Sequence, residues 1–174
     1  MKKLLLLPLL AFAAGPLLCI AQDTKPAAPA APAPPAAPAA PPAEGGDVAK
    51  LKLGVIPFVM KFDKAELTVK AGQKVMLLFQ NEKCVLQHNF LLLKPGTRDA
   101  VGALADKMLA DPQGLAKQYV PESDAVIAKG NKLIGIAQSD LIEFTAPAEP
   151  GDYPYICTFP GHWRLMNGVL KVTK

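Results

Sequence analysis

The sequence predicts an all-β fold, a sandwich of short strands with a small helical insertion. Apolar and polar residues alternate with a period of two in several short stretches of residues 48–174, which is typical of strands with one buried face. Turn residues separate these stretches, and between two of them the period lengthens to three or four residues. A segment of this length is sufficient for one domain built around one core.

The strands predicted before the insertion are short. They are expected at Lys50–Gly54, Leu67–Lys70, Val75–Phe79 and Val85–Leu93. Ala71 and Gly72 mark a turn between the second and third. The fourth is more fully apolar, and His88 lies near its start. A histidine in such a strand is usually a hydrogen-bonded core residue, so His88 alone does not indicate a metal ligand.

The insertion is predicted to be helical. Thr97 is placed to cap a helix whose apolar residues recur at steps of three and four, namely Val101, Leu104, Ala105 and Met108. Asp111 followed by Pro112 is typical of an N-cap and first helical position, so a second short helix is expected to run to about Tyr119. Strands are predicted to resume at Lys132–Ile136 and Asp140–Thr145.

The N-terminal part of the chain has the features of an export signal followed by a spacer. Residues 1–21 combine two lysines, an apolar run and a small residue at the predicted cleavage site after Ala21, and Cys19 leaves open acylation as a lipoprotein. Residues 22–47 are rich in alanine and proline, which predicts an extended linker. We therefore expect an exported protein, periplasmic or tethered on the outer side of a bacterial membrane. A processing tail is the alternative interpretation of the linker.

Charge excludes one class of partner. Removal of Lys2 and Lys3 lowers the formal net charge of the chain from +4 to +2. A nearly neutral chain of this kind is not expected to bind nucleic acid.

The last segment of the chain carries the most informative motif. Cys157, His162 and Met166 are spaced as Cys-x4-His-x3-Met, and Pro160-Gly161 can reverse the chain so that His162 returns beside the sulfur. A thiolate, an imidazole and a thioether suit copper, which is soft as Cu(I) and borderline as Cu(II), whereas zinc has little use for the thioether. The alternative is that the three residues occupy a turn and a core edge independently.

The number of histidines limits the function further. A two-histidine, one-cysteine copper site with a long axial methionine needs a second histidine, and the chain has only His88 besides His162. If both bind one copper, none remains for a second copper centre that could activate oxygen or nitrite. The count favours an electron carrier over an enzyme.

The motif from Cys157 to Met166, together with Gln87-His-Asn-Phe90, resembles the azurin and auracyanin branch of the small blue copper proteins, the cupredoxins. The resemblance covers residues 48–174 and implies a Greek-key β-sandwich with one type 1 copper, held by His88, Cys157 and His162 and axially by Met166. It also implies that Asn89 ties the two ligand segments together through Thr158.

The resemblance further implies transient docking of larger redox proteins, such as a cytochrome-type donor or acceptor. His162 follows a turn, so its ring edge is the part of the site expected to reach the surface. Pro160, Trp163 and Leu165, joined by Met60, are expected to form an exposed apolar patch there.

Two residues depart from the azurin pattern. The azurin disulfide has no counterpart, which leaves Cys84 as a surface thiol, a small buried residue or a disulfide partner of Cys157. Gln87 stands where azurins have glycine, and its side chain is expected to hold the backbone carbonyl away from the metal.

Two further classes of function stay open at this point. A copper chaperone or storage protein is the alternative to the electron carrier, although such proteins usually expose methionine-rich or paired-cysteine segments that this chain lacks. A structural or adhesion module would bind no copper tightly.

Overall fold

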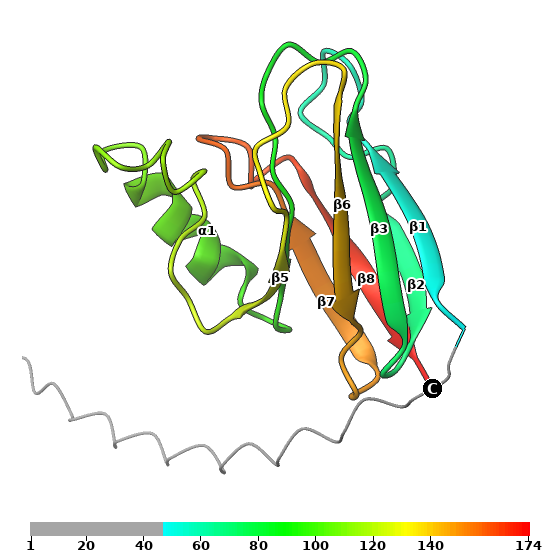
Figure 1. Ribbon diagram of the computed structural model, residues 1–174. Helices are drawn as coiled ribbons and strands as arrows, with labels where there is room; N and C mark the ends of the chain where they lie inside the picture. Colours follow the sequence, from blue (N-terminus) through cyan, green and yellow to red (C-terminus); the bar gives the residue numbers. More distant parts are fainter. Residues whose placement is uncertain (1–46) are drawn as a thin grey trace, which may run out of the picture. The chain divides into compact units, whose positions relative to one another are not determined.

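The computed structural model describes residues 47–174, so the predicted signal segment and almost all of the predicted linker lie outside the described residues. Eight strands and one α-helix make up this part of the chain (Figure 1). The strands are β1 Ala49–Gly54, β2 Glu66–Lys70, β3 Lys74–Asn81, β4 Leu91–Leu93, β5 Val126–Lys129, β6 Gln138–Thr145, β7 Gly151–Ile156 and β8 Asn167–Thr173, and the helix is α1 Arg98–Lys107.

The strands form two sheets, in the orders β1-β3-β6 and β2-β8-β7-β4-β5. Each sheet contains one parallel pair, β1 with β3 and β2 with β8, and the other neighbours are antiparallel. The main core lies between the sheets because alternate side chains of each strand point inward. In β3, Val75, Leu77 and Phe79 are at most 1% exposed, and they share this core with Leu67 and Val69 of β2. The prediction of a β-sandwich is confirmed.

Helix α1 covers the outer face of the five-stranded sheet (Figure 1). Leu91 and Leu93 of β4 face the helix, whereas Leu92 between them belongs to the main core. Val101 of the helix packs against this outer face together with Trp163 from the loop between β7 and β8. Strand β4 is apolar throughout because both of its faces are covered. No helix among the described residues is long and apolar enough to cross a membrane.

The predicted strand Val85–Leu93 is wrong in its first half. The ladder begins at Leu91, and Val85 and Leu86 are 74% and 43% exposed. In the part of the predicted strand that precedes β4, His88 forms an isolated bridge with Ile134. The predicted strand Lys132–Ile136 is likewise reduced to that bridge. Side-chain hydrogen bonds replace the ladder here, since the buried amide of Asn81 binds the backbone of the following loop.

The helical prediction is confirmed for α1 and wrong for the second helix. Residues 112–119 form successive turns, and Gln118 and Tyr119 have φ values of 56° and 54°, which end any helical path. Asp111 accepts a hydrogen bond from the N–H of Gln113, as an N-cap would, but no α-helix follows. Thr97 occupies the N-cap position of α1 without capping it, because its hydroxyl donates to the carbonyl of Lys94.

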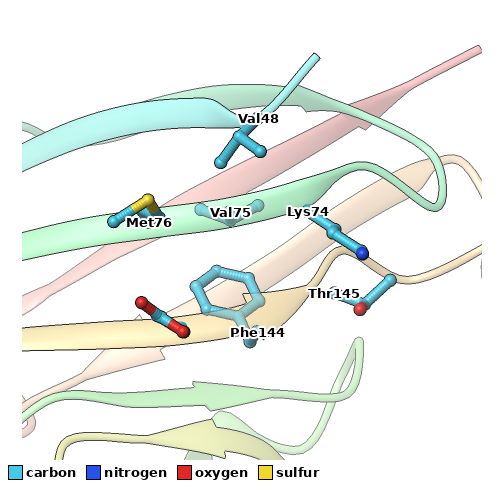
Figure 2. Close-up of a pocket in the computed structure, with 7 residues that line it drawn as sticks. Val48, Lys74, Val75, Met76, Phe144 and Thr145 are labelled. Atoms are coloured by element: carbon cyan, nitrogen blue, oxygen red, sulfur yellow. The ribbon is translucent and has the colours of Figure 1, made fainter. Parts of the chain in front are cut away.

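The three-stranded sheet carries a shallow depression of about 390 Å³ on its surface (Figure 2). Its lining comes from the start of β3, the end of β6 and Val48. His88 follows the opposite end of β3, and none of the predicted metal ligands lines the depression. The depression is therefore not the predicted metal site.

Candidate metal centre

Three side chains from two distant parts of the sequence meet at one buried point. Nδ1 of His88 lies 3.8 Å from Sγ of Cys157, and Nδ1 of His162 lies 3.6 Å from the same sulfur. The potential ligand atoms of all three residues lie within 4.8 Å of one another. Within residues 47–174 this is the one group of three or more histidine, cysteine or acidic side chains arranged to hold a metal ion.

Each of the three side chains is placed by a different local structure. Cys157 directly follows β7. His88 is held by a reciprocal pair of backbone hydrogen bonds with Ile134, at 3.0 and 2.8 Å. His162 closes a turn in which its N–H donates to the carbonyl of Phe159, and Gly161 supplies the φ of +80° that this turn requires. The predicted reversal at Pro160-Gly161 is confirmed.

Met166 belongs to the same loop and is fully buried in the main core beside Cys157. Its carbonyl accepts the N–H of Cys157 at 3.1 Å, and its N–H donates to the carbonyl of His162 at 2.8 Å. These two bonds fix the backbone of the loop between Cys157 and the start of β8.

The two nitrogen–sulfur separations match those of a trigonal metal site. Metal–nitrogen and metal–sulfur bonds of about 2.0 and 2.3 Å that meet at about 120° place nitrogen and sulfur roughly 3.7 Å apart. The two separations in the structure, 3.8 and 3.6 Å, lie on either side of this value. Two imidazoles and a thiolate, with a buried thioether on the same loop, are the donor set that suits copper in both oxidation states.

Burial sets the protonation of the copper-free site. It lowers the pKa of His88 to about 4, with a smaller contribution from the neighbouring His162, and it also lowers the pKa of His162. Burial raises the pKa of the Cys157 thiol to about 12, an effect that the backbone N–H groups of Asn89 and Phe159 partly offset. At neutral pH both imidazoles can therefore accept a metal ion directly, whereas Cys157 must release a proton when it binds one.

A side-chain pair ties the two ligand segments together, as predicted. Asn89 donates from Nδ2 to Oγ1 of Thr158 at 2.9 Å and accepts the N–H of Thr158 at 2.7 Å. Both residues are buried, and each directly follows a candidate ligand. The pair holds His88 and Cys157 in register across 69 residues of sequence.

The predicted surface patch needs one correction. Leu165 and Met60 are 54% and 36% exposed and Pro160 is partly exposed, but Trp163 is only 7% exposed. Its indole packs against α1 and donates from Nε1 to the carboxylate of Asp106, which also binds Arg164. The insertion thus buries this side chain. Nothing in the sequence pattern indicated the pairing of Asp106 with the loop.

The structure decides among the three alternatives for Cys84. The residue is 7% exposed, and both Cys84 and Cys157 are free thiols, so it is a small buried residue and no disulfide joins the two. Its sulfur lies 3.3 Å from Nε2 of His88. The side chain of Gln87, in contrast, is exposed.

Comparisons with known proteins agree with this site. The family model of copper binding proteins of the plastocyanin/azurin family matches residues 49–173. Auracyanin-A from Chloroflexus aurantiacus is 38% identical over 128 residues, which cover 74% of this chain and 76% of that protein. Azurin-1 from Alcaligenes xylosoxydans xylosoxydans is 38% identical over 120 residues, covering 65% of this chain and 89% of the relative.

A solved structure has a fold similar to that of this chain. The structure of auracyanin A, described as a blue copper protein from the same Chloroflexus species, superposes with a TM-score of 0.66 at 39% identity. The match covers 73% of this chain and all of that one.

Proposed function

Because this chain belongs to the plastocyanin/azurin family of copper-binding proteins, we propose that its domain, residues 48–174, carries single electrons between larger redox proteins. His88, Cys157, His162 and Met166 are the residues that would hold one type 1 copper. The observation that carries the proposal is the convergence of two Nδ1 atoms on one sulfur, at 3.8 and 3.6 Å, in a buried site.

The protein's contribution is to hold the ligands still. Copper bound there would accept and release one electron, and transfer is fast only if little rearranges when the charge changes. Cys157, His88 and Met166 are each 0% exposed, so packing restricts their side chains and excludes water. The bonds of the loop and the pair Asn89–Thr158 fix the backbone on both sides of the site.

His162 is the proposed point of electron entry and exit. It is 3% exposed, whereas the other three proposed ligands are fully buried. Leu165, three residues after His162, and Met60, which the family resemblance adds to the patch, are both exposed. An apolar rim of this kind favours brief contacts of small area. Arg164 is the one charged residue of the loop, and its ion pair with Asp106 at 2.8 Å leaves little net charge to steer a partner.

We propose that the domain works outside the cytoplasm. The support is the sequence of residues 1–21 and 22–47, which has the pattern of a signal and a spacer. A cytochrome-type donor or acceptor is the proposed partner class, and the near-neutral charge of the exported chain disfavours nucleic acid. With both histidines of the chain assigned to one copper, the proposed role is transfer without catalysis.

The test is the behaviour of the purified, copper-loaded protein. An electron carrier should show an intense blue Cu(II) form and a reversible one-electron wave in voltammetry, with copper retained in both states. The zinc-loaded protein is the matched control and should be colourless and electrochemically silent. A pale Cu(II) form, or loss of copper on reduction, would instead favour the chaperone or storage function.

A further inference from the structure

The ring of His88 lies between two sulfur atoms. Nδ1 faces Sγ of Cys157 at 3.8 Å, and Nε2, on the opposite edge of the ring, lies 3.3 Å from Sγ of Cys84. His88 is 0% exposed and Cys84 is 7% exposed, so this second contact is shielded from solvent. Among the described residues, the hydrogen-bond partner of Nε2 of His88 is Cys84.

Cys84 is held in place by a buried amide. Asn81, which is 0% exposed, accepts the N–H of Cys84 at 2.9 Å and donates from Nδ2 to the carbonyl oxygens of Cys84 and Leu86 at 3.0 and 2.9 Å. These bonds fix the loop that precedes His88. The backbone of Cys84 is therefore fixed, and the burial of its side chain limits the positions that the sulfur can take.

We propose that Cys84 is a positioning residue for the copper centre: its sulfur accepts a hydrogen bond from Nε2–H of His88 and so keeps the Nδ1 lone pair directed at the metal. This inference rests on the function proposed above, in which His88 is a copper ligand.

The choice of donor follows from the tautomers of histidine. A neutral imidazole carries one proton, and Nδ1 can bind a metal only if that proton is on Nε2. If the thiol of Cys84 donated to Nε2 instead, the proton would sit on Nδ1, between the ring and Cys157, and would block metal binding there. Metal-binding histidines generally donate their other N–H to an acceptor that fixes the ring and its tautomer.

A sulfur acceptor also has an electronic consequence. Thiol sulfur is a weaker hydrogen-bond acceptor than a carbonyl or carboxylate oxygen, so it polarises Nε2–H less and leaves His88 a weaker electron donor. Cu(II) gains more from a strong imidazole donor than Cu(I) does. Removal of even this weak acceptor should therefore disfavour Cu(II) further and raise the reduction potential.

The first measurement needs no copper. Long-range ¹H–¹⁵N NMR of the copper-free protein at neutral pH should show the His88 proton on Nε2. Cys84→Val keeps an apolar side chain of similar size but leaves Nε2–H unpaired in a buried position, so it should reduce the fraction of this tautomer. Cys84→Ser retains a hydrogen-bond acceptor on a shorter side chain. Its fraction of the Nε2–H tautomer should lie between those of the wild type and Cys84→Val.

The second measurement uses the copper-loaded protein. Cys84→Val should weaken Cu(II) binding by about 10- to 100-fold, the effect typical of losing such a partner. Its potential should rise by about 59 mV for each tenfold loss of Cu(II) affinity relative to Cu(I).

A matched control separates positioning from packing. Val69→Ala also changes a side chain of the main core, but at a distance from the site. Val69 pairs with Val172, and Val172 pairs with Gly151, which is at the end of β7 remote from Cys157. The variant should lower the melting temperature without moving the tautomer or the potential.

The proposal would be overturned by a His88 proton on Nδ1 in the wild type. A Cys84→Val variant with wild-type tautomer and potential would overturn it too, since Cys84 would then act by packing alone. Because the tautomer is measured without copper, its result is independent of whether the wild-type protein forms a blue site, which tests the proposed function itself.

Discussion

Gly102 of α1 lies directly against the indole of Trp163, and a Cβ atom at this position would overlap the ring. The contact joins the helical insertion to the loop that carries His162 and Met166. Asp106, one turn further along the helix, binds both Trp163 and Arg164 of that loop. The insertion is therefore a support for the candidate metal centre as well as a cover for the sheet.

Gly102→Ala should destabilise the protein despite the better helix propensity of alanine. Alanine gains up to about 1 kcal/mol in an exposed helix, but overpacking a buried contact typically costs about 1–3 kcal/mol. We expect a net loss of stability in urea and a change in the visible spectrum as the loop shifts. Gly135→Ala, where a Cβ atom would meet its nearest neighbours at 3.7 Å, is the control and should alter neither.

Cys157→Ser should abolish the blue colour and leave the protein folded, because charge transfer from the thiolate to Cu(II) is the proposed source of the colour. Cys84→Ser should remain blue, since its sulfur contacts the far edge of His88. Absorption spectra of the copper-loaded variants, with circular dichroism as the test of folding, check both. Bleaching of the Cys84 variant alone would mean that the wrong sulfur is assigned to the metal.

The copper-free protein should be folded, and copper should raise its melting temperature. The main core contains residues from both sheets, such as Phe79, Leu92 and Tyr155, that are packed independently of the metal. Binding to the folded state then adds stability, by about 4 kcal/mol at a free copper concentration one thousand times the dissociation constant. Circular dichroism of the copper-free protein showing an unfolded chain would contradict this.

The copper-free protein should lose stability as the pH falls from about 6.5 toward 4. Burial lowers the pKa of folded His88 to about 4, whereas the unfolded chain binds a proton near the ordinary value of 6.5. In this window the unfolded state holds one more proton, so the free energy of unfolding falls by up to about 1.4 kcal/mol per pH unit. Urea titrations at pH 7 and 5 measure the slope. His88→Gln should reduce it, and the remainder should come from His162, whose pKa burial also lowers.

Leu165→Lys should slow electron exchange with a redox partner and between two copies of the protein, and leave the absorption spectrum nearly unchanged. Leu165 is 54% exposed on the loop that carries His162, so a charge there weakens apolar docking without touching a ligand. Stopped-flow kinetics and NMR line broadening measure the two rates.

The control for this variant is Leu141→Lys, which adds the same charge to an exposed leucine, 46% exposed, in the middle of β6. It should exchange electrons at the wild-type rate. Equal slowing in both variants would mean that net charge, and not the His162 edge, governs the encounter.

Much of the fold and the centre of the site follow from local sequence patterns. Alternation predicts the strands of the two sheets because each has one buried face, as in β3. The spacing of Cys157, His162 and Met166 predicts one loop because the turn at Pro160-Gly161 is a local property of proline and glycine. The hydrogen bonds between Asn89 and Thr158 do not follow from local patterns, and only the family resemblance implies them.

The errors arise where distant contacts override local preference. Residues 85–90 have the composition of a strand, but Asn81 binds the backbone of Cys84 and Leu86 at the start of this segment, and Val85 is left exposed. Residues 112–119 begin like a helix and become turns. The loop position of Trp163 predicts an exposed side chain, whereas α1 covers it.

The sequence by itself determined the all-β architecture, the copper-type donor set and the limit of one site imposed by two histidines. Only the tertiary structure placed Nδ1 of His88 3.8 Å from Cys157 and its Nε2 3.3 Å from Cys84. It also decided that Asp106 and Gly102 support the metal loop. These relationships depend on how the ends of separate strands and α1 pack together, which periodicity and spacing along the chain do not encode.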